Sequence, residues 1–351
     1  NRQTNGYLDA ICTHIKEAGL LAPNYEVDTI YFGGGTPSTL PIECIAQIVG
    51  ALKEHKYWQE PAEATIEVNP GTADLEKLKA LRSLGFDRIS FGVQSLNDSE
   101  LKTIGRIHSA QEALQAIAWA KEAGFNRISA DLIYGLPGQT LTSLRKTLEE
   151  LTATGIEHVA VYGLIVEEGT PLCTLINEGK LSLPDEDTAA DMYEFVQSFL
   201  KEQGFERYEI SNYAKNGQYS KHNLVYWKYQ PYAAFGAAAC GFDGSSRFTA
   251  SEAVSEYINQ TQAAVIYNEE NLSNEELLGE FMFMGLRKTS GANLREARER
   301  FGIDVMERFA SEMEPFFQKE LLAYDSEKEV LRLTERGMEL GNLVFEIFVT
   351  I

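Results

Sequence analysis

The sequence predicts an α/β fold in which a (β/α) barrel, complete or partial, precedes a smaller, mainly helical domain. Three observations predict this architecture. A helix–glycine–strand unit recurs within the first 205 residues, polar and glycine residues follow most of the predicted strands, and the composition changes after Gly204. A length of 351 residues suits about two domains.

The repeated unit is clearest where Gly-Phe-Asp-Arg-Ile-Ser at 85–90 returns as Gly-Phe-Asn-Arg-Ile-Ser at 124–129. Each copy follows apolar residues at helical spacing, and a glycine there is the usual left-handed end of a helix. Five β-rich runs alternate with such helices, at 29–32, 64–68, 88–94, 127–134 and 158–165. This alternation predicts a parallel sheet with right-handed crossovers.

Polar and glycine residues decide between two parallel-sheet architectures. They follow the predicted strands at 33–37, 67–70, 94–95 and 131–137. A barrel collects functional groups from nearly every strand at its C-terminal face, whereas an open sheet concentrates them at one switch point. The distribution therefore favours a barrel.

The second half of the chain has a different character. Residues 208–250 are rich in aromatic residues and glycine. From Ser273 the pattern predicts two helices, a hairpin formed by 321–324 and 330–333, and a final helix over 334–348. This order resembles a winged-helix module, whose acidic character favours a protein-contact or lid role over DNA binding. We expect domains at 1–205 and 266–351, joined by a connecting region at 206–265.

The composition excludes several classes of protein. The net charge is −21, from 31 basic and 52 acidic residues, and it disfavours a nucleic-acid partner. Four scattered cysteines, Cys12, Cys44, Cys173 and Cys240, form neither a disulfide framework nor a Cys-x-x-Cys metal clip. No signal peptide or membrane span is visible, so we expect a cytoplasmic protein, with transient contact with a membrane protein left open.

The glycine-rich stretch at the end of the first predicted strand is the first candidate site. Gly33, Gly34 and Gly35 carry no side chains, so a ligand can meet bare backbone N–H and C=O groups there. The alternative is a tight βα turn in which Pro37 starts the next helix. The pattern alone leaves the two interpretations equally supported.

A set of polar residues is predicted around the same pocket: Glu67, Gln94, Arg106 and Asp131. Glu67 and Asp131 interrupt apolar strands, where an unpaired carboxylate is costly. Such carboxylates suit ribose hydroxyls or an ammonium group. The alternative is a structural ion pair with Arg88 or Arg127.

His222 begins the segment His-Asn-Leu-Val-Tyr-Trp, and several large aromatic residues follow it. A histidine in such surroundings can ligate an iron while the rings cover a flat macrocycle. The alternative is an aromatic core around a hydrogen-bonded histidine, and the residues by themselves favour that alternative.

Five segments in order resemble the radical S-adenosylmethionine superfamily, in the branch that contains the anaerobic coproporphyrinogen III oxidases and the HemW heme chaperones. They are Tyr-Phe-Gly-Gly-Gly-Thr-Pro at 31–37, Ile-Glu-Val-Asn-Pro at 66–70, Ile-Ser-Phe-Gly-Val-Gln-Ser at 89–95, Gly-Arg-Ile-His at 105–108 and Asp-Leu-Ile-Tyr-Gly-Leu-Pro at 131–137. The resemblance covers essentially the whole chain. It implies a partial (β/α)6, TIM-like barrel, whose first strand is missing from this chain, followed by a C-terminal domain.

The resemblance also implies roles for individual residues. Gly34, Gly35 and Thr36 would contact the methionine moiety of S-adenosylmethionine. Glu67, Gln94, Arg106 and Asp131 resemble the family's polar contacts to that cofactor. His222, Tyr226 and Trp227 match a signature that separates the HemW group from the oxidases, which reverses the preference above and makes His222 a candidate heme ligand.

Two departures from the family pattern concern cysteines. The resemblance implies a [4Fe–4S] cluster held by a Cys-x3-Cys-x2-Cys motif, and this sequence has none, so we expect those cysteines upstream of Asn1. Relatives often have Ala-His-Ser where this chain reads Ala239-Cys240-Gly241, which leaves Cys240 open as a soft iron ligand.

Three functions remain in competition. The first is a HemW-like chaperone that binds heme, S-adenosylmethionine and, in the intact chain, the cluster, and delivers heme to an unknown acceptor protein. The second is oxygen-independent coproporphyrinogen III oxidase, which decarboxylates porphyrinogen propionates. The third is a scaffold without a cluster that binds a partner through the C-terminal module. The signature around His222 favours the chaperone, and whether the protein is an enzyme stays open.

Overall fold

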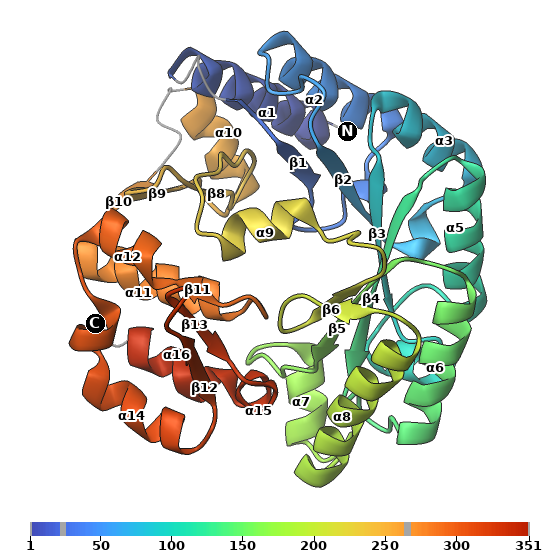
Figure 1. Cartoon of the computed structure of the whole chain (residues 1–351). Coiled ribbons are helices and arrows are strands. Elements are labelled where there is room, and N and C mark those ends of the chain that lie inside the picture. The colour runs from blue at the N-terminus through green and yellow to red at the C-terminus, as the bar shows by residue number, and fades with distance from the viewer. Residues whose placement is uncertain (1, 22–25, 263–267, 350–351) are drawn as a thin grey trace.

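The computed structural model describes residues 2–21, 26–262 and 268–349. Its largest sheet has seven strands in the order β1-β2-β3-β4-β5-β7-β6 (Figure 1). The first five strands are parallel: β1 Thr29–Phe32, β2 Glu63–Val68, β3 Arg88–Gln94, β4 Arg127–Tyr134 and β5 His158–Gly163. All five lie where the sequence predicts them, although β5 ends at Gly163 rather than at residue 165.

Two short strands that the sequence analysis did not predict extend the sheet. β7, Asn212–Ala214, pairs antiparallel with β5, and β6, Glu206–Arg207, pairs antiparallel with β7. Strands of two and three residues are too short for an alternating pattern, which explains why the prediction misses them.

Helices cover the outer face of the curved sheet, as a partial barrel requires (Figure 1). They are α1 Arg2–Leu21, α2 Ile42–Glu54, α3 Leu75–Leu84, α4 Asp98–Thr103, α5 Ala110–Glu122, α6 Leu141–Ala153, α7 Pro171–Asn177 and α8 Glu186–Glu202, with 3-10 turns η1 Pro37–Thr39 and η2 Pro70–Thr72. Local signals set their ends: Asp74 accepts the backbone N–H of Lys77 to cap α3, and Gly85 ends it at φ 116°. One hydrophobic core joins α1, α2, α3, α5, α6 and α8 to the sheet.

The connecting region places a short helix on the inner side of the sheet. α9, Lys221–Trp227, contacts β1 and α11 and lies between the barrel and the C-terminal elements (Figure 1). A small antiparallel sheet of β8 Cys240–Phe242, β9 Ser246–Thr249 and β10 Asn268–Asn271 follows, and α10 Val254–Gln262 packs on α1. The predicted boundary between residues 265 and 266 and the residue Asn1 lie outside the described residues.

The C-terminal part has its own hydrophobic core and contains the predicted hairpin, β12 Leu322–Asp325 with β13 Val330–Leu333, extended by β11 Ala292–Asn293. Four helices precede it where the sequence predicts two: α11 Asn274–Leu286, α12 Leu294–Phe301, α13 Val305–Arg308 and α14 Ala310–Gln318. The predicted single final helix is two, α15 Glu335–Glu339 and α16 Gly341–Val349. Within the described ranges, every helix is too short or too polar to cross a membrane.

Candidate functional site

The glycine-rich stretch follows β1 and leaves its backbone open. Gly34 and Gly35 have φ of 76° and 155°, conformations that favour glycine. A Cβ atom built on either one meets nothing within 4 Å, and residues 33–36 are exposed. Thr36 makes no capping hydrogen bond with its side chain. These backbone groups are therefore accessible to a ligand at the C-terminal end of β1.

Gly33 has a different role, because its missing side chain leaves space for Tyr31 and Glu67. The Tyr31 hydroxyl donates a hydrogen bond of 2.6 Å to Oε1 of Glu67. A Cβ on Gly33 would lie 2.5 Å from a ring carbon of Tyr31 and 2.9 Å from the Glu67 carboxyl. The pair can form only because residue 33 lacks a side chain.

Asp131 projects from β4 toward the same region. Ser90 donates to its Oδ1 at 3.2 Å, and burial together with the nearby Glu67 carboxylate raises the pKa of Asp131 to about 7. The structural ion pairs that the sequence analysis weighed for Glu67 and Asp131 form elsewhere. Arg127 and Arg88 face Glu63, at 2.6 and 3.9 Å. Asp131 is therefore left for another partner.

Arg106 and Gln94 complete the polar set at the end of β3. Nη2 of Arg106 donates to the carbonyl of Gly92 at 2.8 Å, whereas its Nε is buried without a partner among the described residues. Gln94 lies at a register shift in β3 and has φ of 65°, a strained conformation of the kind that clusters at functional sites. The structure thus brings all the predicted S-adenosylmethionine residues to the C-terminal ends of β1 to β4.

Asp131 and Tyr162 combine burial with access to solvent. The pKa values of both side chains are raised first by burial. Tyr162 nevertheless keeps 41 % of its surface accessible, and Asp131 is half-buried. Both side chains are therefore accessible to a ligand at this end of the sheet.

The candidate heme ligand His222 is the second residue of the inner helix α9. Glu63 accepts the backbone N–H groups of Lys221 and His222 at 3.1 and 2.9 Å, which anchors the start of the helix to β2. Both ring nitrogens of His222 are engaged, Nδ1 with the Thr29 hydroxyl and Nε2 with the Tyr226 hydroxyl, each at 2.9 Å. Burial lowers the pKa of His222 to about 4, so the imidazole is neutral at pH 7.

Tyr31 connects the two candidate regions. Its ring stacks on the His222 imidazole with centroids 4.9 Å apart and planes 17° from parallel, while its hydroxyl bonds Glu67. The sequence places Tyr31 within the motif at 31–37 and predicts no role for it. Glu63 was also missed, because its contact with α9 spans 159 residues of sequence.

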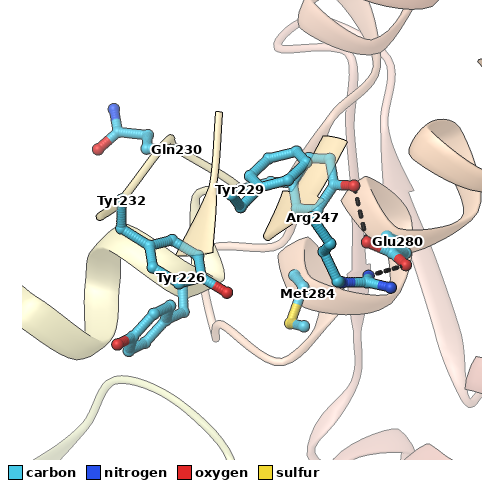
Figure 2. A pocket seen from close by; sticks show the side chains of 8 residues that line it. Tyr226, Tyr229, Gln230, Tyr232, Arg247, Glu280 and Met284 are labelled. Atoms are coloured by element: carbon cyan, nitrogen blue, oxygen red, sulfur yellow. Dashed lines mark hydrogen bonds and ion pairs between the residues drawn. The ribbon is translucent and has the colours of Figure 1, made fainter. Parts of the chain in front are cut away.

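Tyr226 and Trp227 continue α9 toward the C-terminal core. Tyr226 borders a pocket that Tyr229, Gln230, Tyr232, Phe242, Arg247, Glu280 and Met284 also line, and Figure 2 shows Glu280 joined to Tyr229 and Arg247. The pocket encloses about 70 Å³, far below the several hundred Å³ of ordinary ligand sites. Cys240 lies near Tyr226 and Tyr232 and accepts a bond from the Thr249 hydroxyl at 3.5 Å.

The described residues offer no ligands for an iron–sulfur cluster. The four cysteines are free thiols, and no group of three His, Cys, Asp or Glu side chains within the described ranges can hold a metal ion. S-adenosylmethionine fits better, because open backbone groups, the hydrogen-bonded carboxylates of Glu67 and Asp131 and the buried Nε of Arg106 lie at one edge of the sheet.

Comparisons with known proteins agree with this geometry. Residues 10–151 match the model of the radical SAM superfamily, and residues 272–340 match that of the HemN C-terminal domain. The chain is 36 % identical to the heme chaperone HemW of Lactococcus lactis, over 92 % of this chain and 84 % of the relative. It is 38 % identical to HemW of Bacillus subtilis, over 92 % and 86 %. The chain belongs to the HemW family of radical SAM proteins.

A solved structure carries the same fold. Coproporphyrinogen III oxidase (HemN) from Escherichia coli superposes with a TM-score of 0.84 over 99 % of this chain and 83 % of that one, at 22 % identity. The predicted barrel with a C-terminal domain is thereby confirmed. Membership of the radical SAM superfamily implies S-adenosylmethionine and a [4Fe–4S] cluster, while the roles of individual residues in this HemW-family chain stay predictions.

Proposed function

We propose that this chain is a cytoplasmic heme chaperone that binds heme beside α9 and delivers it to an acceptor protein. The family supports this function, since the relatives that share most of its length are named heme chaperones. The observation that carries it is His222, a half-buried and neutral imidazole on the inner side of the sheet. Neutral imidazole is the form that binds a metal.

The contacts of His222 suggest how heme is bound and released. Nε2 of His222 is occupied by the Tyr226 hydroxyl at 2.9 Å, and Nδ1 is held by Thr29. Iron ligation replaces the first of these bonds, while the second keeps the ring oriented, as the outer hydrogen bond does for ligating histidines in general. Return of the Tyr226 hydroxyl then favours release, so the bound state is one that can be reversed.

S-adenosylmethionine binds, in this proposal, at the strand ends. The open backbone of Gly34 and Gly35 with Thr36 receives its methionine moiety. Polar groups of the remaining predicted residues, Glu67, Gln94, Arg106 and Asp131, contact the rest of the cofactor. The cluster has no ligands among the described residues, so no step of the proposal involves it.

A hemin titration of three proteins tests the ligand assignment. We expect a Soret shift in the parent chain and binding at least tenfold weaker in His222→Ala. His55→Ala, which changes a histidine at the end of α2 on the outer layer, serves as the matched control and should bind like the parent. Equal binding by His222→Ala would contradict the assignment. Formation of protoporphyrinogen from coproporphyrinogen III by the intact chain, extended upstream to include the cluster cysteines and reconstituted with the cluster, would favour the oxidase instead.

A further inference from the structure

Arg287, the residue that follows α11, has a guanidinium without a partner. Its Nε is buried and lacks an acceptor, and its side chain makes neither a hydrogen bond nor an ion pair within the part of the chain that the structure describes. A half-buried arginine is normally paired, because its five N–H donors lose water on burial. Arg287 therefore has free hydrogen-bonding capacity.

Two aromatic rings hold the Arg287 guanidinium in place. Its Cζ atom lies 4.6 Å from the centroid of the Trp227 ring and 5.9 Å from that of Phe283. Such stacking fixes the plane of the guanidinium without using its N–H groups. An arginine that is oriented but unpaired is suited to receive a carboxylate in a two-pronged hydrogen bond.

The acidic side chain near Arg287 does not bond its guanidinium N–H groups. Glu209 lies close enough to act electrostatically on Arg287, but no ion pair within 4.0 Å joins them. The Glu209 carboxylate is fully buried. Its Oε1 accepts the Ser211 backbone N–H at 2.9 Å and a bond from the Asn212 amide, whereas its Oε2 has no hydrogen-bond partner among the described residues. Glu209 thus stabilises the positive charge without occupying the N–H donors.

Arg247, on the neighbouring hairpin, shows the contrast. It bonds Glu280 and lies 3.7 Å from Glu270, and Figure 2 shows the first of these pairs. Its charge is already neutralised, whereas that of Arg287 is not. Arg287 differs from Arg247 in that none of its guanidinium N–H groups is bonded to another of the described residues.

The position of Arg287 places it beside α9. Glu280, Met284 and Arg287 recur at helical spacing from α11 to the residue that follows it, and the first two line the pocket beside Tyr226. Trp227, the last residue of α9, stacks on the guanidinium itself. Arg287 therefore lies next to the helix that presents His222.

We propose that Arg287, held by Trp227, binds a propionate carboxylate of heme. The inference rests on the proposed function, since heme is the ligand, and it adds the group that recognises the edge of the macrocycle away from the iron. Trp227 follows Tyr226 on α9, so the iron ligand and the carboxylate receptor are presented by the same helix and its stacked neighbour. Arg287 is a binding residue, and no bond is made or broken in this step.

The test compares two probes that differ only in the carboxylates, hemin and hemin dimethyl ester. Both are titrated into the parent chain and into Arg287→Gln, with folding checked by circular dichroism. We expect Arg287→Gln to weaken hemin binding by about tenfold to a hundredfold, the effect of losing a hydrogen bond between charged groups, and to change ester binding by less than about threefold. Arg287→Lys, which keeps the charge but not the fork, should fall between.

A matched control is Arg145→Gln, which removes an arginine stacked at 4.3 Å on Phe195 on the outer helices. It should keep the parent's ratio of hemin to ester affinity. Equal losses for both probes in Arg287→Gln, or no loss for either, would overturn the inference while hemin binding by the parent still supports the chaperone. Absence of hemin binding by the parent would overturn both.

The methionine moiety of S-adenosylmethionine carries a second carboxylate that an arginine can bind. Calorimetry with S-adenosylmethionine tests whether Arg287 binds that carboxylate instead of a heme propionate. The inference expects unchanged affinity for S-adenosylmethionine in Arg287→Gln. A loss of that affinity with retained hemin binding would assign Arg287 to the cofactor instead and overturn the proposal.

Discussion

The strand-end region and the α9 region differ in how far they are prepared for a ligand. At the strand ends, Gly34 and Gly35 expose their backbone, Arg106 leaves a buried Nε unpaired, and Asp131 accepts a bond from Ser90 but forms no ion pair within 4.0 Å among the described residues. On α9, both nitrogens of His222 are already bonded. The first region is open as it stands, whereas the second exchanges an internal hydrogen bond for a ligand.

This difference suits two kinds of binding. An open, strained site binds a cofactor without rearrangement, whereas a site closed by its own hydrogen bonds binds more weakly and releases more easily, because the ligand replaces an existing interaction. Weak reversible binding is what delivery of heme needs. Tyr31 joins the two regions by stacking on His222 and bonding Glu67. The predictions below change one region at a time.

The largest effect is expected at Glu63, which anchors the start of α9 to β2. Glu63→Gln removes a fully buried carboxylate that faces Arg88 and Arg127 and caps the start of α9. Breaking such a buried pair leaves uncompensated charge, so we expect a loss of about 3 to 5 kcal/mol in the free energy of unfolding. Urea denaturation measures it. The exposed pair at Glu76 gives the control, since Glu76→Gln should change stability by less than about 0.5 kcal/mol; similar losses in both variants would contradict the anchoring role.

Gly33→Ala should damage the strand-end region. The new Cβ would lie 2.5 Å from Tyr31 and 2.9 Å from Glu67, so one of them must move, at a cost of about 1 to 3 kcal/mol. We expect S-adenosylmethionine binding, measured by calorimetry, to weaken by about tenfold or more, because this corresponds to at least 1.4 kcal/mol. Gly50→Ala in α2, where a Cβ meets nothing within 4 Å, should leave binding unchanged. Unaltered binding in Gly33→Ala would show that the Tyr31–Glu67 pair is not needed there.

The two regions should respond to pH with opposite signs. The pKa of Asp131 is raised from 3.8 to about 7 in the folded chain. Between these pH values the folded state keeps a proton that the unfolded state loses, so the free energy of unfolding falls as pH rises. His222, with a pKa lowered from 6.5 to about 4, makes stability rise with pH over that window.

The variant Asp131→Asn removes the pH dependence that Asp131 causes. The free energy of unfolding of this variant minus that of the parent should rise by an amount on the order of 2 kcal/mol between about pH 4 and pH 7. Urea denaturation at the two pH values measures the difference. A difference that does not change with pH would contradict the raised pKa.

Tyr226→Phe should have the smallest effect and the most specific one. It removes the hydroxyl that occupies Nε2 of His222 and keeps the ring that packs against Tyr232 at 4.7 Å. Because heme no longer has to replace that bond, hemin should bind about fivefold more tightly, equivalent to a hydrogen bond of about 1 kcal/mol. Soret titration measures the change, and weaker binding would show that the Tyr226 hydroxyl contributes to the heme site.

The sequence predicts those parts of the molecule that depend on local pattern. The five parallel strands follow from the repeated glycine-ended unit, and the residues at their ends converge because a barrel brings strand ends together. The break between α15 and α16 at Leu340 is missed, because the apolar spacing continues across it and Gly341 packs tightly on Phe345.

Contacts between distant segments could not be predicted in this way. The Tyr31–Glu67 bond depends on the register of β1 on β2. The anchoring of α9 by Glu63 depends on the position of the connecting region. The unbonded guanidinium of Arg287 depends on all of its neighbours. A single sequence contains no periodic signal for any of the three.

The central claim is that heme binds to α9 by exchange with an internal hydrogen bond of His222. Parallel hemin titrations of the parent, Tyr226→Phe and His222→Ala test it most directly. The account predicts the order of affinity Tyr226→Phe, then parent, then His222→Ala, with the last at least tenfold weaker than the parent. Equal affinity for the parent and His222→Ala would contradict the account.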